Sequence, residues 1–396
     1  MHTSDTAYQH DPQQHPQGAG ESHDEHGIQK ERLSWREQRL AVKVAAVIMG
    51  LVLALLLPEA AFRLRQYLKY GTMRPSVNDL QNDPIAKLWV PAPGRMTRNI
   101  SINSLGFRSP ELVNPKPVGT IRVAFLGAST TFCAEVSSNE TTWPHLVWKT
   151  LQQNRPDIRF DYLNAAVSGY TTVQSIRNLE YRVKSQQPDV IVIYGDLPND
   201  LSGDTREVAS NQGIVRGSVD LFGGLARWSL TWFLVEKNLV AWRRQHEAMD
   251  DNRRTVTFVP EQLSAPFHSR LRELVRNAQQ ISPLVVLPTF SKRLRWNQTR
   301  EEQVRASSTL LYYNPYMTIK GLLTAYDEYN RVTRLVARET GALLIEGEDS
   351  IPPDSAHFAD SLHFTDLGAA VMAHRVSTAL IASDRFQQLM AVKAVH

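Results

Sequence analysis

Two distant segments of the sequence carry side chains that could perform nucleophilic chemistry. Ser129 follows the apolar run 121–126 through a turn of small residues, and its hydroxyl could attack an electrophilic centre. His363 could serve as the base for that hydroxyl, and Asp360, three residues earlier, could fold back to orient the imidazole. Taken singly, each segment also has a structural explanation, namely a tightly packed turn and a local carboxylate–imidazole pair. Together they would support attack by an activated hydroxyl.

Two further segments could supply hydrogen-bond donors to the negative charge that such an attack develops. Gly169 lies after the run 160–163, and the lack of a side chain would let its N–H approach a substrate oxygen closely. Asn199 lies after the run 189–194, and its amide is a neutral donor that would leave a neighbouring base uncharged. An ordinary turn at Gly169 and an Asx-turn at Asn199 are the alternatives.

Two other side chains compete for these roles. Cys133, the only cysteine, could act as a nucleophile, although no base lies close to it in the sequence. His357 could act as the base in place of His363. A single cysteine excludes an intramolecular disulfide and a multi-thiolate metal site, and the expected chemistry requires no metal and no organic cofactor.

Alternating apolar runs and helical stretches indicate how these segments are positioned. Strands are predicted over 121–126, 160–163, 189–194, 284–288 and 342–346. Helices are predicted over 142–153, 172–184, 267–280, 319–339 and 366–381. This alternation is typical of a parallel sheet covered by helices on both faces, where the ligand crevice lies beyond the carboxyl ends of the strands. The chemistry is therefore expected just after Leu126, Leu163, Tyr194 and Ile345.

The ordered set Ser, Gly, Asn and Asp-x-x-His over 121–381 resembles the SGNH hydrolase superfamily, also called the GDSL-type esterases or lipases. The resemblance implies an α/β class, with three layers (α/β/α) around a mostly parallel five-stranded sheet. It also implies an esterase whose acyl-enzyme forms on a serine. The segment 103–111 is similar to one that precedes this domain in some membrane-anchored members.

The resemblance also implies a role for each residue of the ordered set. Ser129 would be the nucleophile, His363 its general base and Asp360 the partner that orients the base. The oxyanion hole would be formed by the backbone N–H groups of Ser129 and Gly169 and by the side-chain amide of Asn199. Two departures from the family pattern stand out. Ala128 replaces the Asp of the usual Gly-Asp-Ser block, and Gly195 lies four residues before Asn199 instead of two, with Pro198 between them.

The N-terminal third of the chain predicts a membrane anchor. Residues 1–39 are a polar, His-rich tail that is expected to be disordered, since apolar residues are nearly absent from 1–29. Residues 40–62 are predicted to be a transmembrane signal-anchor helix around the uncharged run 44–57. A cleavable signal peptide and a buried core helix are the alternatives. A linker is expected over 63–118, followed by the hydrolase domain over 119–396 with an insertion over 201–262.

The basic residues that flank the apolar run indicate its orientation. Five precede the run and four follow it, and they are Lys30, Arg32, Arg36, Arg39, Lys43, Arg63, Arg65, Lys69 and Arg74. Positive charge favours the cytoplasmic side. The N-terminus is therefore expected in the cytoplasm and the catalytic domain outside it, in the periplasm or the extracellular space.

Two aromatic clusters lie outside the ordered set. One is a helical stripe in the insertion, formed by Trp228, Trp232, Val235, Leu239 and Trp242. We expect the stripe to pack on the sheet, with a lid, a bilayer contact or a sugar platform as alternatives. The other is Tyr312, Tyr313 and Tyr316, which could stack on sugar rings or simply pack.

Composition bounds the function further. The chain has 396 residues with a formal net charge of +4, and its arginines are scattered, so nucleic acid is not an expected partner. The prediction is a membrane-anchored serine esterase, with O-acyl groups on a cell-surface or exported polysaccharide as candidate substrates. An O-acyltransferase that acts on an exported glycan is the main alternative, and a catalytically inactive glycan-binding scaffold is another. A lysophospholipase or a thioesterase also remains open.

Overall fold

The computed structural model describes residues 35–70, 80–214, 224–225, 228–247 and 255–394. The chain divides into two compact units, Met1–Leu55 and Leu56–His396. Of the disordered tail predicted over 1–39, residues 1–34 lie outside the described residues, and residues 35–39 are helical.

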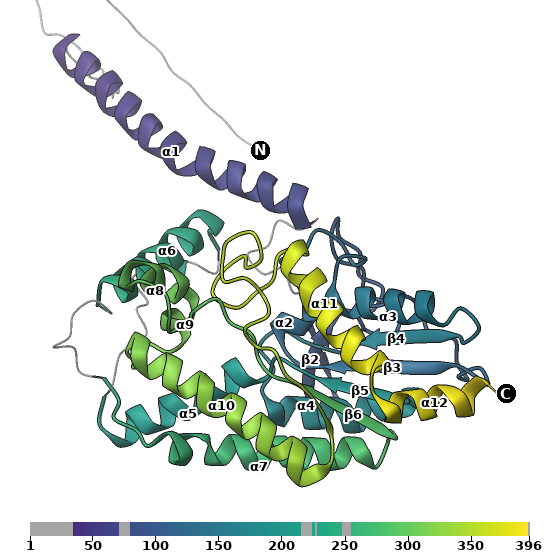
Figure 1. Ribbon diagram of the computed structural model, residues 1–396. Helices are drawn as coiled ribbons and strands as arrows, with labels where there is room; N and C mark the ends of the chain where they lie inside the picture. The colour runs from purple at the N-terminus through teal and green to yellow at the C-terminus, as the bar shows by residue number, and fades with distance from the viewer. Residues whose placement is uncertain (1–34, 71–79, 215–223, 226–227, 248–254, 395–396) are drawn as a thin grey trace, which may run out of the picture. The chain divides into compact units, whose positions relative to one another are not determined.

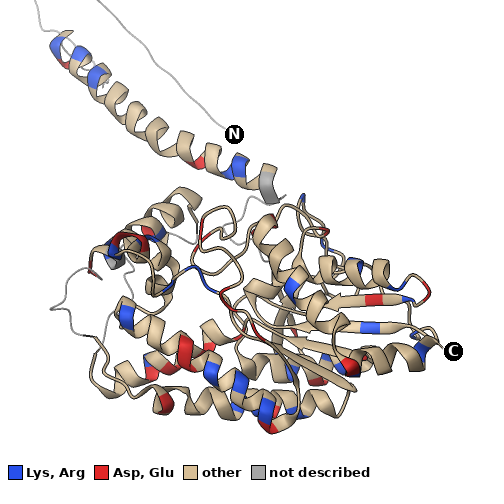
Figure 2. Cartoon of the chain, viewed as in Figure 1, with Lys and Arg blue, Asp and Glu red and all other residues tan. Residues whose placement is uncertain are grey.

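Helix α1 (Trp35–Tyr70) contains the predicted anchor. It is long and apolar enough to cross a membrane over Trp35–Leu68, a property that a signal sequence can share. The side chains of residues 44–57 are exposed, which contradicts the alternative of a buried core helix. Figure 2 shows that this middle part of α1 carries no charged side chain, whereas Lys and Arg lie beside Asp and Glu on helices elsewhere in the chain.

Five parallel strands form the central sheet, as the alternating pattern predicted. They run in the order β4-β3-β5-β6-β7 (Figure 1), and their bounds are Phe160–Asn164, Ile121–Leu126, Val190–Ile193, Leu284–Pro288 and Leu343–Ile345. Every residue of β3, β5 and β6 is buried, as expected where helices cover both faces of a sheet. The chain moves from β3 to one side for β4 and then to the other side for β5. The sheet therefore has its topological switch point at the carboxyl end of β3, where such sheets open a ligand crevice.

Helices form the two outer layers (Figure 1). One face of the sheet carries α3 (Trp143–Asn154), α11 (Asp366–Ile381) and α12 (Asp384–Ala394). The other face carries a mutually packed group, with bounds Thr172–Asn178 for α4, Leu197–Asn211 for α5, Pro260–Gln279 for α7 and Ile319–Thr340 for α10. The predicted class, an α/β fold of three layers with a five-stranded parallel sheet, is confirmed.

Two predicted helices differ from the observed ones. The helix expected over 172–184 consists of α4 followed by a π-helical turn (Leu179–Val183) and a 3-10 turn (Lys184–Gln186). Helix α7 begins at Pro260, seven residues before the expected start at 267. Pro260 occupies the first turn, where the missing N–H costs nothing, and Pro266 hides the continuity of the helix in the sequence.

Several short elements were not predicted. A two-stranded antiparallel sheet pairs β1 (Leu80–Asp83) with β2 (Leu88–Pro91). The other short elements surround the carboxyl edge of the main sheet, and they are α2 (Ser129–Phe132), α8 (Arg300–Ala306) and α9 (Ser308–Tyr313). The described residues of the insertion include helix α6 (Leu230–Glu247).

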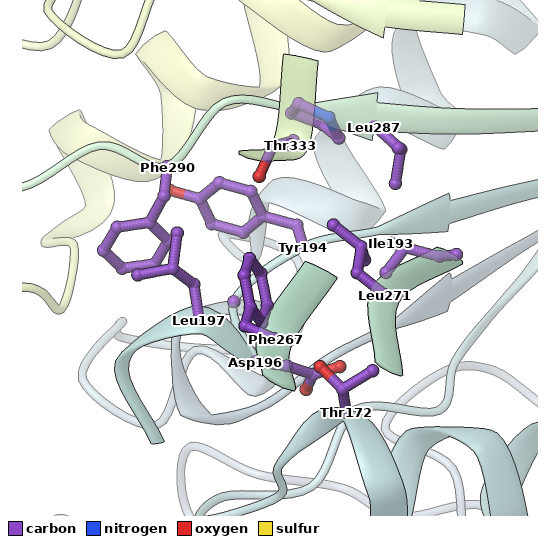
Figure 3. A pocket seen from close by; sticks show the side chains of 12 residues that line it. Thr172, Ile193, Tyr194, Asp196, Leu197, Phe267, Leu271, Leu287, Phe290 and Thr333 are labelled. Atoms are coloured by element: carbon purple, nitrogen blue, oxygen red, sulfur yellow. The ribbon is translucent and has the colours of Figure 1, made fainter. Parts of the chain in front are cut away.

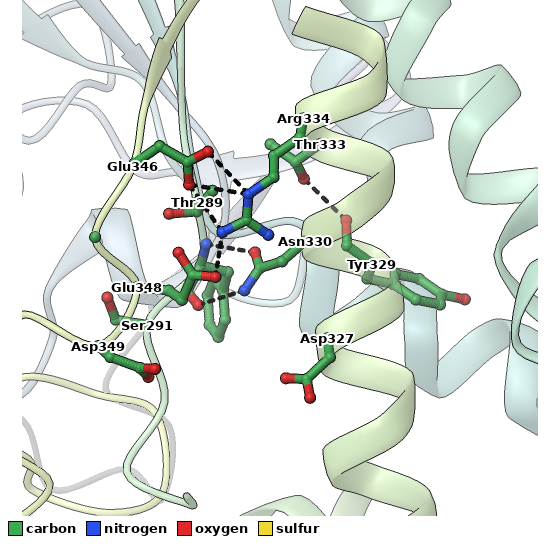
Figure 4. A network of polar contacts seen from close by, with 12 residues as sticks. Thr289, Ser291, Asp327, Tyr329, Asn330, Thr333, Arg334, Glu346, Glu348 and Asp349 are labelled. Carbon is green, nitrogen blue, oxygen red and sulfur yellow. Dashed lines mark hydrogen bonds and ion pairs between the residues drawn. The ribbon is translucent and has the colours of Figure 1, made fainter.

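Helix α10 holds the loops that leave β6 and β7 (Figure 4). The amide of Asn330 accepts from the Phe290 N–H at 2.7 Å and donates to the Phe290 carbonyl at 3.0 Å. One turn later, Arg334 forms ion pairs with Glu346, at 2.8 Å, and with Glu348. These contacts fix the carboxyl edge of the sheet near the loop that carries Asp360 and His363.

Candidate active site

The turn after β3 presents Ser129 at the carboxyl edge of the sheet. Gly127 has a φ of +149°, and a Cβ atom there would lie 1.6 Å from the Tyr194 carbonyl oxygen, so only glycine fits. Ser129 is the first residue of the one-turn helix α2. Thr131, in the same turn, donates its hydroxyl to the Tyr194 carbonyl at 2.6 Å. The carbonyl of Tyr194, the residue that follows β5, therefore holds the turn in place.

The loop before α11 brings Asp360 and His363 to Ser129. Asp360 accepts two backbone N–H groups, those of Leu362 at 2.8 Å and His363 at 2.9 Å. Its other oxygen lies 2.8 Å from His363 Nδ1, and His363 Nε2 lies 2.8 Å from Ser129 Oγ. A carboxylate can only accept, so Nδ1 carries a proton and Nε2 is left to accept from the serine hydroxyl. The three side chains form one continuous hydrogen-bonded row.

The charges of this row reinforce one another. Burial opposes the charge on Asp360, but the His363 imidazole and the two backbone donors lower the pKa of the carboxyl to about 2. Burial likewise lowers the pKa of His363, but the Asp360 carboxylate outweighs it, and the net pKa of His363 is raised above its usual value. The imidazolium that forms when His363 takes a proton is therefore stabilised by its neighbour.

Gly169 and Asn199 face the same cavity as Ser129. Gly169 adopts a φ of +86°, and its N–H has no partner among the described residues. The Asn199 side chain donates one N–H to the Tyr170 carbonyl at 2.8 Å, which fixes the amide and leaves its second N–H available. Asn199 keeps this position although Pro198 precedes it, because both belong to the first turn of α5.

The five predicted site residues line a cavity of about 760 Å³. Its walls come from the turns after β3, β4 and β5, from α6 and α9, and from the loop before α11. Sequence reasoning missed the contribution of α6, whose side chains Phe233, Leu234, Lys237 and Asn238 line the cavity, and that of Arg65 and Gln66 in α1. Tyr312 and Tyr313 also line it, whereas Tyr316 packs against the hydrophobic core.

The rival residues lie outside this arrangement. Cys133 is buried, and burial raises the pKa of its thiol to about 12, so the thiol stays protonated at neutral pH. The His357 ring lies 2.8 Å from Asp354, on the exposed side of the loop. Among the described residues, no cluster of three His, Cys, Asp or Glu side chains is placed to hold a metal ion.

The expected packing of the insertion stripe on the sheet is wrong. Trp228 is 81 % exposed and Trp242 is 56 % exposed, while Val235 and Leu239 are also exposed. The stripe lies on a helix, as predicted. Its side chains are on a different face of that helix from the side chains that line the cavity.

Arg108 supports the serine turn from behind, a role that the sequence did not reveal. Its guanidinium is buried and donates to the carbonyls of Phe132 at 2.8 Å and Cys133 at 2.5 Å, at the end of α2. It also donates to Asn139 Oδ1 at 2.9 Å and to the Asn99 carbonyl at 2.9 Å. The segment around 103–111 therefore packs against the turn that presents Ser129.

A second, much smaller cavity of about 30 Å³ lies deeper, beside Asp196 (Figure 3). Asp196 is buried, and neither of its carboxyl oxygens meets hydrogen-bond geometry with a described residue. Burial and the neighbouring Asp200 carboxylate raise the pKa of Asp196 well above its usual range, and nearby Ser175 offsets this only in part. The space is large enough for one water molecule.

Replacing Asp196 with asparagine is expected to stabilise the fold at neutral pH. The raised pKa means that the folded state holds a proton that the unfolded state has released, so the wild-type stability falls as the pH rises above the unfolded value near 4. Asp196→Asn removes this loss, so the free energy of unfolding at neutral pH should be higher for the variant than for the wild type. Urea titrations at acid and neutral pH would measure it. A gain that is equal at both pH values would contradict the explanation.

A half-buried row of hydroxyl, imidazole and carboxylate at the switch point of a parallel sheet defines a hydrolase-type site on an α/β fold. A family model described as the GDSL-like Lipase/Acylhydrolase family matches residues 125–371. The match covers more than half of the chain, and the chain belongs to this family. The predicted SGNH resemblance is thereby confirmed, and so is the prediction of a hydrolase that acts on ester bonds.

The solved structures to which the chain is similar are distant in sequence. An acetylxylan esterase from Geobacillus stearothermophilus is 17% identical, with 67% of this chain and 95% of that chain covered and a TM-score of 0.40. An α/β hydrolase from the metagenome of Lake Arreo, Spain, is 16% identical, with coverages of 65% and 94% and a TM-score of 0.40. A two-domain esterase active on acetylated mannans is 17% identical, with coverages of 68% and 51% and a TM-score of 0.39. At these TM-scores the substrates of these enzymes say nothing about this chain. No curated protein sequence matches the chain.

Proposed function

We propose that the protein is a serine esterase in which Ser129 is the nucleophile, His363 the general base and Asp360 the residue that orients the base. The observation that carries this proposal is the row of two 2.8 Å contacts from Ser129 Oγ through the imidazole to Asp360. Nucleophilic catalysis by serine needs a base within hydrogen-bond reach and a third group that holds the base. No other His among the described residues contacts the Ser129 hydroxyl.

The reaction proceeds in two steps through an acyl-enzyme. His363 Nε2 takes the Ser129 proton while Oγ attacks the ester carbonyl carbon, and the carbonyl oxygen becomes an oxyanion. The N–H groups of Ser129 and Gly169 and the free N–H of Asn199 stabilise that charge. The imidazolium then protonates the leaving alcohol. In the second step His363 removes a proton from water as the oxygen attacks the acyl carbon. The bond from that carbon to Ser129 Oγ then breaks, the acid leaves, and the imidazolium returns its proton to Oγ.

The substrate class that fits the cavity best is an O-acylated glycan. The cavity is far larger than a short acyl group, and its lining alternates apolar side chains with amide, hydroxyl and charged groups. Tyr312 and Tyr313, whose rings meet edge to face at 5.1 Å, offer an aromatic surface on which a sugar ring could stack. Mass spectrometry of products from acetylated oligosaccharides would identify the acceptor. Transfer to a glycan hydroxyl in place of water would make the enzyme an acyltransferase.

Helix α1 is the proposed membrane anchor, with the N-terminus in the cytoplasm and the catalytic body exported. The helix is long and apolar enough to cross a membrane, and the flanking basic residues favour this orientation. Protease treatment of intact spheroplasts checks the orientation, and a protected C-terminal body would contradict it.

A fluorophosphonate probe tests the proposed nucleophile directly. Such probes react with activated serine hydroxyls, so the folded protein should be labelled at Ser129, and peptide mapping should locate the adduct there. Labelling that is absent, or that maps to another residue, would overturn the assignment.

The pH dependence of turnover is expected to respond to two charged side chains at the cavity wall. His363 acts as a base only when neutral, so its raised pKa places the acid limb of the kcat/KM profile above the pH of an ordinary histidine. The Glu135 carboxylate raises the pKa of His363 and the Lys237 ammonium lowers it. Glu135→Gln should therefore move the acid limb to lower pH, and Lys237→Met should move it to higher pH. Shifts in the same direction for both variants would contradict this electrostatic account.

A further inference from the structure

Helix α6 has two functional faces. One face lines the catalytic cavity through Phe233, Leu234, Lys237, Asn238 and Ala241. At 3.6 residues per turn, Val235, Leu239 and Trp242 fall on the opposite side of the helix, where they are 47 %, 44 % and 56 % exposed. Trp228, just before the helix, is 81 % exposed and continues the same line. Helix α6, which forms one wall of the cavity, thus carries an exposed apolar stripe on its opposite face.

The beginning of α6 is held by Glu59, a residue of α1. The Glu59 carboxylate accepts from the Ser229 hydroxyl at 2.8 Å and from the N–H groups of Leu230 at 3.0 Å and Thr231 at 2.9 Å. These bonds satisfy N–H groups that have no partner inside the helix. Arg63 forms an ion pair with Glu59 at 2.6 Å and donates to the Trp228 carbonyl at 2.6 Å. All of these residues belong to the compact unit Leu56–His396.

Glu59 follows the uncharged run 44–57 by only two residues of the same helix. A helix rises 1.5 Å per residue, so Glu59 lies about 3 Å beyond the end of the run. The predicted span 40–62 ends only three residues after Glu59, so when this span crosses a bilayer the Glu59 carboxylate lies close to the level of the headgroups. The first turn of α6 and Trp228, which are bonded directly to Glu59 and Arg63, then share that level. Tryptophan is the residue type that membrane–water interfaces favour most clearly.

We infer that α6 lies along the membrane surface and inserts Trp228, Val235, Leu239 and Trp242 into the boundary between headgroups and acyl chains. The occupant of the exposed stripe is the lipid bilayer in which α1 is anchored, so the inference rests on the anchoring proposed above. The helix is then an interfacial one, with its apolar face in lipid and its other face toward Ser129. The catalytic cavity would open beside the membrane surface, where esters carried by membrane-attached molecules are concentrated.

Depth-dependent fluorescence quenching tests this placement. The full chain, with Trp35→Phe to remove the tryptophan at the start of α1, is reconstituted in vesicles of equal parts phosphatidylcholine and phosphatidylglycerol. The acyl chains are brominated close to their ester ends, and bromine quenches only tryptophans that reach that depth. Trp228→Phe combined with Trp242→Phe should remove most of the quenching. The matched control is Trp89→Phe, which removes an exposed tryptophan from β2 and should leave most of the quenching in place.

Four outcomes would overturn the inference. The first is a chain that floats with the vesicles but shows the same quenching with and without Trp228 and Trp242. The second is quenching of these two residues by aqueous iodide in the vesicles. The third is protection of Trp228 and Trp242 from iodide that disappears when a dimer is diluted. That result would mean that a second copy of the chain covers the stripe. The fourth is a chain that does not float, since the anchor itself then fails. None of these readouts depends on esterase activity, so failure of the proposed chemistry would be recognised separately, by the fluorophosphonate probe.

Discussion

Replacing Ser129 with alanine should lower kcat on p-nitrophenyl acetate by about 10⁴-fold or more, because no other hydroxyl of the described residues contacts His363 Nε2 to form the acyl-enzyme. His363→Ala should have an effect of similar size, since the hydroxyl then has no base. The two losses should not add in the double variant, because residues that act as one unit fail together. Initial rates with purified protein would measure all three.

Asp360 provides the graded comparison for this series. Asp360→Asn should keep a side chain of the same size but favours the wrong imidazole tautomer, and we expect a loss of up to about 10⁴-fold in kcat. Ser137→Ala is a suitable control, because that hydroxyl bonds to Asp366 near the cavity and contacts none of the three residues. Wild-type turnover in Ser129→Ala would refute the assignment.

Replacing Arg108 with alanine is expected to cause the largest loss of stability of the substitutions considered. The guanidinium is almost completely buried and donates to the carbonyls at the end of α2. Alanine would leave a cavity, a Phe132 carbonyl without a donor among the described residues, and a Cys133 carbonyl with only the long 3.4 Å contact from the Val136 N–H. Each unpaired buried acceptor costs about 1–3 kcal/mol, so a loss of about 3–5 kcal/mol in the free energy of unfolding is expected. Burial lowers the pKa of Arg108 only to about 10, so the group is charged at neutral pH.

Urea titration measures this loss, and the turnover of the protein that remains folded reports on the serine turn. Arg155→Ala is the matched control, because Arg155 pairs with Asp157 at the surface and its removal should change stability little. A stable Arg108→Ala protein with normal turnover would show that the turn after β3 keeps its conformation without the Arg108 guanidinium. Arg108→Lys should be intermediate, since an ammonium cannot make the forked contacts of a guanidinium.

The parts of the site that could be predicted from the sequence are those with a local signature. Asp360 and His363 are three residues apart, and the turn between them is closed by the Asp360 carboxylate, which accepts from the backbone N–H of His363. Strand β5 is an uninterrupted apolar run and β3 is apolar except for Arg122, so the position of Ser129 and Asn199 after them followed from the rules for parallel sheets.

The parts that could not be predicted depend on contacts between distant segments. Arg108 is a charged residue between Phe107 and Ser109, and no periodicity marks it as buried. The stripe on α6 has the spacing of a core-facing helix, because an apolar face that contacts lipid and one that contacts protein look the same in a sequence. Asp196 precedes Asn199 in an ordinary turn pattern, and only the packing of α7 and β6 around it reveals its isolation.

The small sheet of β1 and β2 determines where a recombinant enzyme can begin. Tyr170, next to Gly169, donates its hydroxyl to the Trp89 carbonyl at 2.8 Å, and Arg177 donates to the Ala86 carbonyl at 2.6 Å. A fragment cut to the family match at 125 would lose both contacts as well as Arg108, and the loop of Gly169 would keep only part of its hydrogen bonds. Soluble protein for substrate screening should therefore start upstream of Leu80, although every residue of the ordered Ser, Gly, Asn and His set lies more than forty positions later.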